Sequence, residues 1–323
     1  MSSSTNILAT MQLVQKYLYQ FGGPVLIFIG TIGCILNLIV FSQKNLRKSP
    51  CSIYFIAHNY ANFVFIYFSL LFATLSLGYG IDISTKHIVI CRIRLYITIL
   101  SNVLSPFYLV FASIDRVVIT SQNALTRRRS TRRIACICIA IGTLFWTLLH
   151  TLILVFANII QIGPNAFICY FQLSVYVSFL SYYSLFRAIT VLSLMIICGI
   201  WSIKNVRHLQ QVRPAASLSA TVATDQHSHS SKDRQLFFIL LIDIVIYALF
   251  SFAFAFYLIY QQITQNDIKN AGRTQIETIS SNLCQFSGTI PFCISFYGNF
   301  IISKTFRNEV KKILSCQQCF RLH

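Results

Sequence analysis

Few residues in this sequence have the type and spacing that covalent catalysis requires. Asp243 is the one carboxylate inside a long apolar run and away from its ends, so the pair of acids that an aspartyl dyad needs is not available. His227 and His229 lie in a polar stretch with no further ligand nearby in the sequence, whereas a metal site needs three or four. No Ser–His cluster is apparent. We therefore expect no enzyme, no metal site and no other cofactor.

Charged residues within or next to apolar runs suggest a function other than catalysis. Asp115 and Arg116 follow directly on the apolar run 95–114, and charges within or at the edge of a membrane are costly and usually functional. Their alternative role is to fix topology as ordinary cytoplasmic charges. Arg187 interrupts a later apolar run, where it either extends to the membrane interface or contacts a ligand.

The elements that position these residues must be membrane spans. The chain has 323 residues, of which 55% are hydrophobic and 11% charged, and its mean hydropathy is +0.66. Soluble domains average about 25% charged residues. The net charge of +18 could indicate nucleic-acid binding, but the Lys and Arg residues lie in short gaps between apolar runs and form no solvated face. Nucleic acid is therefore excluded as a partner.

Seven segments are long and apolar enough to cross a bilayer, which takes about 20 residues. The run 134–186 is too long for one helix, and the turn signal Gly163-Pro164-Asn165 divides it into the fourth and fifth spans. The stretch 207–234 is rich in Ser, Ala and His and is predicted to be a flexible linker. The predicted spans occupy 17–43, 51–81, 95–114, the two parts of 134–186 with the second continuing to 203, 236–266 and 278–303.

Basic residues fix the orientation of these spans. Of the 26 Lys and Arg residues, 19 lie in the gaps on one side, namely 44–48, 116–133, 204–234 and 303–323. The positive-inside rule makes that side cytoplasmic. We therefore expect a multi-pass plasma-membrane protein of the all-α class, with an extracellular N-terminus at 1–21, a seven-helix domain at 22–303 and a cytoplasmic amphipathic helix and tail at 304–323.

The third predicted span carries a family resemblance. Ile114-Asp115-Arg116-Val117 resembles the Asp/Glu-Arg-Tyr motif of rhodopsin-like (class A) G-protein-coupled receptors, with Val117 in place of Tyr. Cys91 lies 25 residues before Arg116, which is the family's spacing and corresponds to about 37 Å of helix. The resemblance implies a disulfide between Cys91 and Cys169. Asn37 and Trp146 resemble the family's marker residues in helices one and four.

The segment after the seventh span resembles the family's eighth helix. Phe306-Arg307 matches its start, and Phe306, Val310, Ile313 and Leu314 form an apolar stripe opposite basic residues. This pattern predicts a short amphipathic helix on the inner leaflet. Cys316 and Cys319 follow it directly. We favour S-palmitoylation of these cysteines over zinc or redox chemistry, since neither a second pair nor a folded domain accompanies them.

The resemblance implies a receptor that binds an extracellular ligand and activates a heterotrimeric G protein. In the family, the helix-three Arg pairs with its neighbouring acid and with an acid at the foot of helix six. Asp115 and Asp233 match these two roles for Arg116. Release of the helix-six pair would free Arg116 to meet the G protein.

The ligand expected from the resemblance is not a biogenic amine, because Thr98 occupies the position of the amine receptors' Asp. Thr98, Asn102 and Arg187 are the predicted ligand contacts. Seven basic residues against three acids on the outer side disfavour a cationic ligand. The runs 50–55 and 202–207 resemble invertebrate orphan receptors near the FMRFamide-receptor-like group, which suggests a neuropeptide ligand.

The chain departs from the family at the residues that switch it. Asn62 replaces the sodium-binding Asp of helix two, Ala253 stands at the Pro position of helix six, and Ser295 and Asn299 replace the ends of Asn-Pro-x-x-Tyr. We expect a replacement polar network in the membrane. These departures keep a second hypothesis open, a seven-helix protein that does not couple to G proteins, such as a decoy receptor, a scaffold or a chemosensory channel subunit. The predicted network residues are Asn37, Asn62, Asp243 and Asn299.

Overall fold

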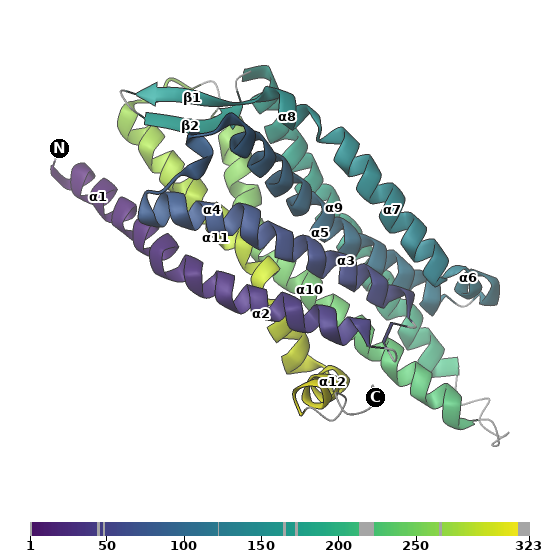
Figure 1. Ribbon diagram of the computed structural model, residues 1–323. Coiled ribbons are helices and arrows are strands. Elements are labelled where there is room, and N and C mark those ends of the chain that lie inside the picture. The colour runs from purple at the N-terminus through teal and green to yellow at the C-terminus, as the bar shows by residue number, and fades with distance from the viewer. Residues whose placement is uncertain are drawn as a thin grey trace.

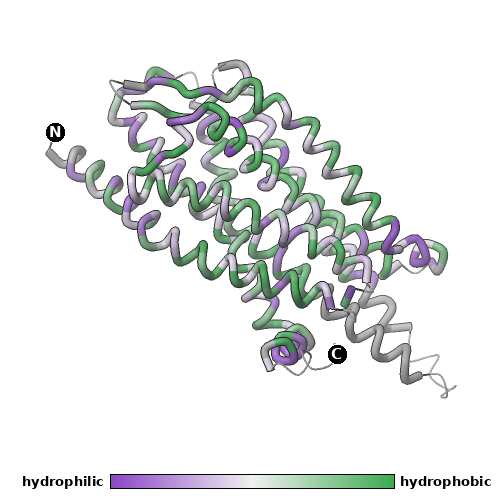
Figure 2. Tube along the Cα trace, in the orientation of Figure 1, coloured by the Kyte–Doolittle hydropathy of each residue, from purple (hydrophilic) through white to green (hydrophobic). Residues whose placement is uncertain are grey.

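A computed structural model describes residues 2–43, 46–47, 49–121, 123–163, 166–171, 174–212, 223–264 and 267–315. The helices run side by side in one elongated bundle, with the N-terminus at one end and the C-terminus near the other (Figure 1). Hydrophobic residues predominate along the middle of the bundle, and hydrophilic residues gather towards its ends (Figure 2). This distribution is the one that a bilayer around the middle of the bundle requires.

The first two membrane helices each contain wide turns of π-helix. The first consists of α1 (Ser2–Tyr17), the π-turn η1 (Leu18–Gly22) and α2 (Gly23–Ser42). The second consists of α3 (Pro50–Phe65), the π-turn η2 (Ile66–Leu70), α4 (Leu71–Ala73) and the π-turn η3 (Thr74–Gly78). Such turns occur mostly as single-turn insertions, often at functional sites.

The remaining elements complete the bundle and its caps. Side-chain hydrogen bonds cap the first turn of several of these helices. For example, Asn270 accepts a hydrogen bond from the amide of Arg273 at the start of α11. In chain order the elements are η4 (Ile83–Thr85), α5 (Ile88–Thr120), α6 (Ala124–Arg129), α7 (Arg132–Leu149), α8 (Leu152–Phe156), β1 (Ala157–Gly163), β2 (Ala166–Phe171), α9 (Ser174–Val212), α10 (Ala223–Ile263), α11 (Ala271–Ile302) and α12 (Lys304–Leu314).

The seven-helix prediction is confirmed, although the seventh helix is less apolar than the others. Among the described residues, six helical segments are long and apolar enough to span a membrane, the last of them Phe238–Ile263. The seventh, α11, packs along α10 and α2 and carries Asn282, Ser295 and Asn299. Some of its polar side chains point into the bundle. We therefore assign α11 to the membrane from its packing against α10 and α2 rather than from its hydropathy.

The predicted boundary between helices four and five was only partly right. The run 134–186 is divided between two helices as predicted, but helix four ends earlier than the turn signal, at Phe156, and an antiparallel hairpin of β1 and β2 follows it. Its register pairs Ile159 with Cys169 and Ala157 with Phe171. The β-branched and aromatic residues of 157–171 favour strands. They were assigned to helices because they lie within one long apolar run.

Helices five and six extend further towards the cytoplasm than the sequence suggested. Helix α9 continues to Val212 and α10 begins at Ala223, where a linker was predicted over 207–234. Residues 213–222 lie outside the described part of the chain. The prediction was wrong for the flanks of this stretch, since a strongly helical span can propagate one bond per added residue into polar sequence.

The predicted eighth helix is confirmed as α12, which crosses the cytoplasmic end of the bundle (Figure 1). Ser303 caps it by accepting a hydrogen bond from the amide of Phe306. Phe306 is 1% exposed and its ring lies 5.7 Å from the rings of both Phe41 and Phe296. Aromatic contacts of this kind bury large apolar area, so α12 is anchored to helices one and seven.

Candidate functional site

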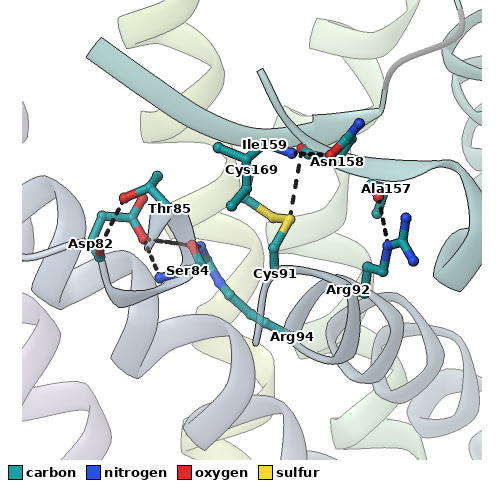
Figure 3. The surroundings of a disulfide bond; sticks show 10 residues. All are labelled: Asp82, Ser84, Thr85, Cys91, Arg92, Arg94, Ala157, Asn158, Ile159 and Cys169. Carbon is teal, nitrogen blue, oxygen red and sulfur yellow. Dashed lines mark hydrogen bonds and ion pairs between the residues drawn. A yellow bond between two sulfur atoms is a disulfide. The ribbon is translucent and has the colours of Figure 1, made fainter. Parts of the chain in front are cut away.

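The outer end of helix three is fastened to the β-hairpin by the predicted disulfide. Cys91 opens α5 and Cys169 lies on β2, with a Cα–Cα distance of 5.6 Å (Figure 3). Arg92 Nε donates a further hydrogen bond, 3.1 Å long, to the carbonyl of Ala157. The hairpin is therefore held over the outer end of the bundle by one covalent and one polar link.

A second tie lies on the other side of helix three. Asp82 accepts a hydrogen bond from the Ser84 amide at 2.9 Å and so caps the short helix η4. Arg94 Nη1 donates to Ser84 Oγ at 2.7 Å and lies 3.9 Å from Asp82 Oδ1 (Figure 3). The Arg94 guanidinium also stacks 5.2 Å over the Phe72 ring. Cation–π and polar contacts thus fix the loop between helices two and three.

Helices six and seven are joined on the outside by an ionic cluster around Glu277, which precedes the seventh span. Its carboxylate accepts hydrogen bonds from Lys269 Nζ at 2.6 Å, Arg273 Nε at 3.0 Å and Tyr260 Oη at 2.9 Å. Burial acts to raise the pKa of Glu277, but the hydrogen bonds from Lys269, Tyr260 and Arg273 outweigh it, so the pKa lies below its usual range. The outer acid Asp267 is also paired, with Arg273 at 2.9 Å.

The three predicted ligand contacts lie on α5 and α9. Thr98 Oγ1 donates to the Phe68 carbonyl at 2.9 Å, so its hydroxyl proton is already bound within the protein. Arg187 does not extend to the interface: its Nη1 donates to the Asn102 carbonyl at 3.0 Å. Arg187 Nε is buried without a hydrogen-bond acceptor among the described residues. The structure brings Asn102 and Arg187 together, and Thr98 lies one turn further out on α5.

A histidine that the sequence did not single out as functional organises the middle of the bundle. His58 is 5% exposed, and its Nε2 lies 3.0 Å from Asn62 Nδ2 while its Nδ1 lies 3.0 Å from the Ser105 carbonyl. Because the amide of Asn62 donates to Nε2, the ring hydrogen is assigned to Nδ1. Ser105 Oγ closes the cluster by donating to Asn62 Oδ1 at 2.5 Å.

Asp243 faces the same small cavity as this cluster. The cavity holds about 10 Å³ and is lined by His58, Asn62, Ser105, Asp243 and Pro291 among others. Asp243 is 4% exposed, and neither of its oxygens has a hydrogen-bond partner among the described residues. A volume of that size holds about one water molecule.

The predicted polar network is therefore divided into separate parts. Ser295 and Asn299 of α11 lie beside Asp243, at contacts that fall outside the geometry of a well-formed hydrogen bond. Asn62 shares the cavity with Asp243 but bonds to helix three. Asn37 lies apart, where its Nδ2 donates to Asn59 Oδ1 at 2.7 Å. Helices two, three, six and seven meet at one polar centre, and helices one and two share another contact.

The foot of helix three buries the predicted coupling pair. Arg116 is 1% exposed and Asp115 is 9% exposed. Arg116 Nη2 lies 3.6 Å from Asp115 Oδ2 and donates to Ser49 Oγ at 3.0 Å. A charged pair removed from water in this way requires compensating polar contacts, which the loop serine helps to supply.

Two loop serines that the sequence analysis missed hold this pair. Ser49 lies before α3, in the first cytoplasmic loop, and Ser130 lies between α6 and α7, in the second. Ser130 Oγ donates a short hydrogen bond to Asp115 Oδ1. No local sequence pattern predicts such a role for a single serine in a loop. Ser49 and Ser130 each directly follow basic residues on the cytoplasmic side.

Three predicted residues lie outside what the structure describes. Asp233 falls on the backbone of α10, but its side chain is not among the described side chains, and Cys316 and Cys319 follow the last described residue. Their predicted roles in coupling and palmitoylation remain predictions. Among the described residues, no group of three His, Cys, Asp or Glu side chains could hold a metal ion.

The sequence profile described as "7 transmembrane receptor (rhodopsin family)" matches residues 33–296 of this chain. The match covers most of the chain and extends from the middle of α2 to the C-terminal part of α11. No curated protein matches the sequence.

Proposed function

Because this chain belongs to the rhodopsin family of seven-transmembrane receptors, we propose that it binds an extracellular ligand and activates a heterotrimeric G protein. The observation that carries the proposal is the burial of Arg116 at the cytoplasmic foot of helix three. The Arg116 guanidinium is 1% exposed and paired with Asp115. Its five N–H donors suit recognition of carbonyl and carboxylate groups, so it would bind such groups of the G protein once it is exposed. Opening the foot of the bundle would present those donors to the G protein.

The hinge for such an opening is Pro291 of α11. Proline inside a helix removes one backbone hydrogen bond and bends the helix, and Pro291 lies one turn before Ser295. It lines the same cavity as Asp243. A change in the polar centre around Asp243 would therefore act directly on this bend. This hinge replaces the prolines that the chain lacks in helices five and six.

The ligand we propose is a neutral or anionic molecule, with a neuropeptide as the leading class. The outer acids Asp82, Asp267 and Glu277 are each paired with a basic side chain. Arg187 has no acid partner among the described residues and its Nε is unsatisfied. Carbonyl or carboxylate groups of a peptide would satisfy that donor, whereas an ammonium group would find no available acid.

Nucleotide exchange tests this function. Membranes that contain the receptor should accelerate GTP binding by at least one G-protein class, with or without a peptide library, relative to membranes without it. If no class responds to any ligand, the coupling proposal fails. Cell-surface detection of an N-terminal tag shows in the same experiment that the receptor is folded and correctly oriented.

The second candidate function is a seven-helix protein that does not couple. The observation that favours it is α10, which runs from Ala223 to Ile263 without an internal proline, so helix six lacks the family's usual bend. Electrophysiology distinguishes a channel subunit from a decoy receptor or a scaffold. A ligand-gated conductance would indicate a channel subunit, and ligand binding without exchange would indicate a decoy or scaffold.

We also propose that Cys316 and Cys319 are palmitoylated. In support, α12 is docked through Phe306 and Val310, so the chain after Leu314 starts at the inner leaflet. Acyl chains at that point would add membrane affinity at about 0.8 kcal/mol per buried methylene. Acyl-exchange labelling should disappear in the double variant Cys316→Ser/Cys319→Ser and persist in Cys136→Ser, which alters a thiol in α7.

A further inference from the structure

A groove lies between the first and second membrane helices, away from the polar centre and the coupling pair. It has a volume of about 420 Å³ and is bounded by Pro24 to Ile32 on α2 and by Tyr67 to Tyr79 on the second helix. Phe28 and Tyr79, at its rim, are 67% and 49% exposed. The groove therefore opens towards the bilayer. Its volume falls within the range of sites that bind small molecules, about 300–1,000 Å³.

Close helix contact at one end and two π-turns shape this groove. The two helices touch at their outer ends, where a Cβ on Gly23 would lie 2.3 Å from Thr74 Oγ1 and one on Gly78 would lie 2.9 Å from the Gln20 amide nitrogen. Thr74 and Gly78 belong to the π-turn η3, and Tyr67 of the groove lining belongs to the π-turn η2. The two π-turns therefore form part of the groove wall on the second helix.

The lining of the groove selects against a charged headgroup. Its lining residues include no Lys, Arg, Asp or Glu. At the deep end, the hydroxyls of Thr31 and Tyr67 lie 3.2 Å apart and are hydrogen-bonded to each other. At the outer end, Tyr79 Oη donates to the Gln20 carbonyl at 3.0 Å, which leaves its oxygen lone pairs able to accept a hydrogen bond. Thr74 also lines the groove, and its Oγ1 has no hydrogen-bond partner among the described residues. The available polar groups are therefore the hydroxyls of Tyr79 and Thr74 at the outer end, and the surface below them is largely apolar.

We propose that this groove binds a sterol from the outer leaflet, with the sterol hydroxyl at Tyr79 and its rings along α2. The nine residues from Pro24 to Ile32 extend over about 12 Å of helix, most of the roughly 15 Å depth of one leaflet. A rigid, uncharged ligand with one terminal hydroxyl matches that length and the location of the polar groups at the outer end. A phospholipid carries a charged headgroup that finds no partner among the lining residues.

Photolabelling of the full-length receptor in phosphatidylcholine nanodiscs tests the proposal. The probes are a diazirine-bearing cholesterol analogue and, in parallel, a phosphatidylcholine with a diazirine on its acyl chain. Peptide mapping should place saturable cholesterol labelling at residues 24–32 and 67–79, displaced by unlabelled cholesterol. The acyl probe should label the lipid-facing helices broadly and without saturation. Saturable labelling of the groove by the acyl probe alone would overturn the sterol assignment.

Two variants and a control locate the site. Ile27→Trp fills the groove and should reduce saturable labelling at least about fivefold, whereas Ile39→Trp adds the same side chain on α2 outside the groove and should leave it unchanged. Tyr79→Phe removes only the hydroxyl and should raise the half-saturating sterol concentration about fivefold, the effect of one hydrogen bond. Thermal unfolding confirms that each variant folds. Equal labelling of all three variants would contradict the proposal.

Discussion

Ser130, in the second cytoplasmic loop, donates a hydrogen bond to Asp115 of helix three, and Asp115 in turn pairs with the buried Arg116. Ser49 of the first loop binds the same Arg116. Two loops therefore hold one ion pair at the foot of one helix. In the proposed mechanism, these two loop contacts keep the foot of the bundle closed, and losing one of them should shift the equilibrium towards the open state.

Removing the Ser130 hydroxyl should raise basal signalling. A hydrogen bond to a charged group contributes about 1.5–3 kcal/mol, so Ser130→Ala should favour the open state by about ten- to hundredfold. The measurement is ligand-free nucleotide exchange at matched surface expression. Ser121→Ala, in the same loop but without a bond to Asp115, serves as the control. Unchanged basal exchange in Ser130→Ala would show that this bond does not restrain Arg116.

Loss of the outer disulfide should destabilise the receptor. Cys91 and Cys169 are 78 residues apart, and removing a native disulfide typically costs about 2–5 kcal/mol. Cys169→Ser should lower the thermal unfolding midpoint and surface expression, and mild reductant should do the same to the wild type. Cys136→Ser changes an exposed thiol on α7 and should match the wild type. A Cys169→Ser variant as stable as the wild type would contradict a structural role for this bond.

Replacing the buried acid by its amide should stabilise the fold. Asp243 is 4% exposed and lacks a hydrogen-bond partner among the described residues, and charges within a membrane are costly. We expect Asp243→Asn to stabilise the receptor by about 1–2 kcal/mol, seen as a higher unfolding midpoint. Asp243→Leu, which leaves Asn299 and Ser295 without a polar neighbour, should lower it. A lower unfolding midpoint in Asp243→Asn than in the wild type would show that the carboxylate itself stabilises the polar centre.

Stability should depend on acid pH through Glu277. Its pKa in the folded receptor lies below the ordinary value of 4.5, so the folded state binds fewer protons than the unfolded state there. The stabilisation is present above pH 4.5 and is lost as pH falls through the lower, folded-state pKa. The unfolding midpoint of the wild type should exceed that of Glu277→Gln at pH 7, and the difference should shrink below pH 4.5. A difference that grows on acidification would contradict this assignment.

Much of the fold could be predicted because hydropathy and basic residues report directly on the bilayer. Apolar length located the spans, and Cys91 and Arg116 fixed helix three at both ends. The hairpin 157–171 was not predicted, because short apolar strands and the apolar ends of helices have similar compositions and cannot be told apart by periodicity alone. The extension of α9 and α10 was missed because polar residues in a cytoplasmic helix resemble a linker.

The site was less predictable than the fold, because its contacts join distant segments. Asp115 and Arg116 were identified from their motif, but nothing local marks Ser49 or Ser130 as their partners. The proximity of His58, Asn62 and Ser105 arises only when α3 packs on α5. Asp243 and Asn62 were predicted to belong to one polar network. They share a cavity, but the side chain of Asn62 forms hydrogen bonds with His58 and Ser105.

The most direct test of the central claim is nucleotide exchange by Arg116→Ala beside Arg132→Ala, both at matched surface expression. Arg116 is buried at the foot of helix three, whereas Arg132 is an exposed cytoplasmic arginine at the start of α7. We expect Arg116→Ala to abolish stimulated exchange while ligand binding persists, and Arg132→Ala to retain at least about half of the stimulated exchange. Intact exchange in Arg116→Ala would contradict the coupling role of Arg116.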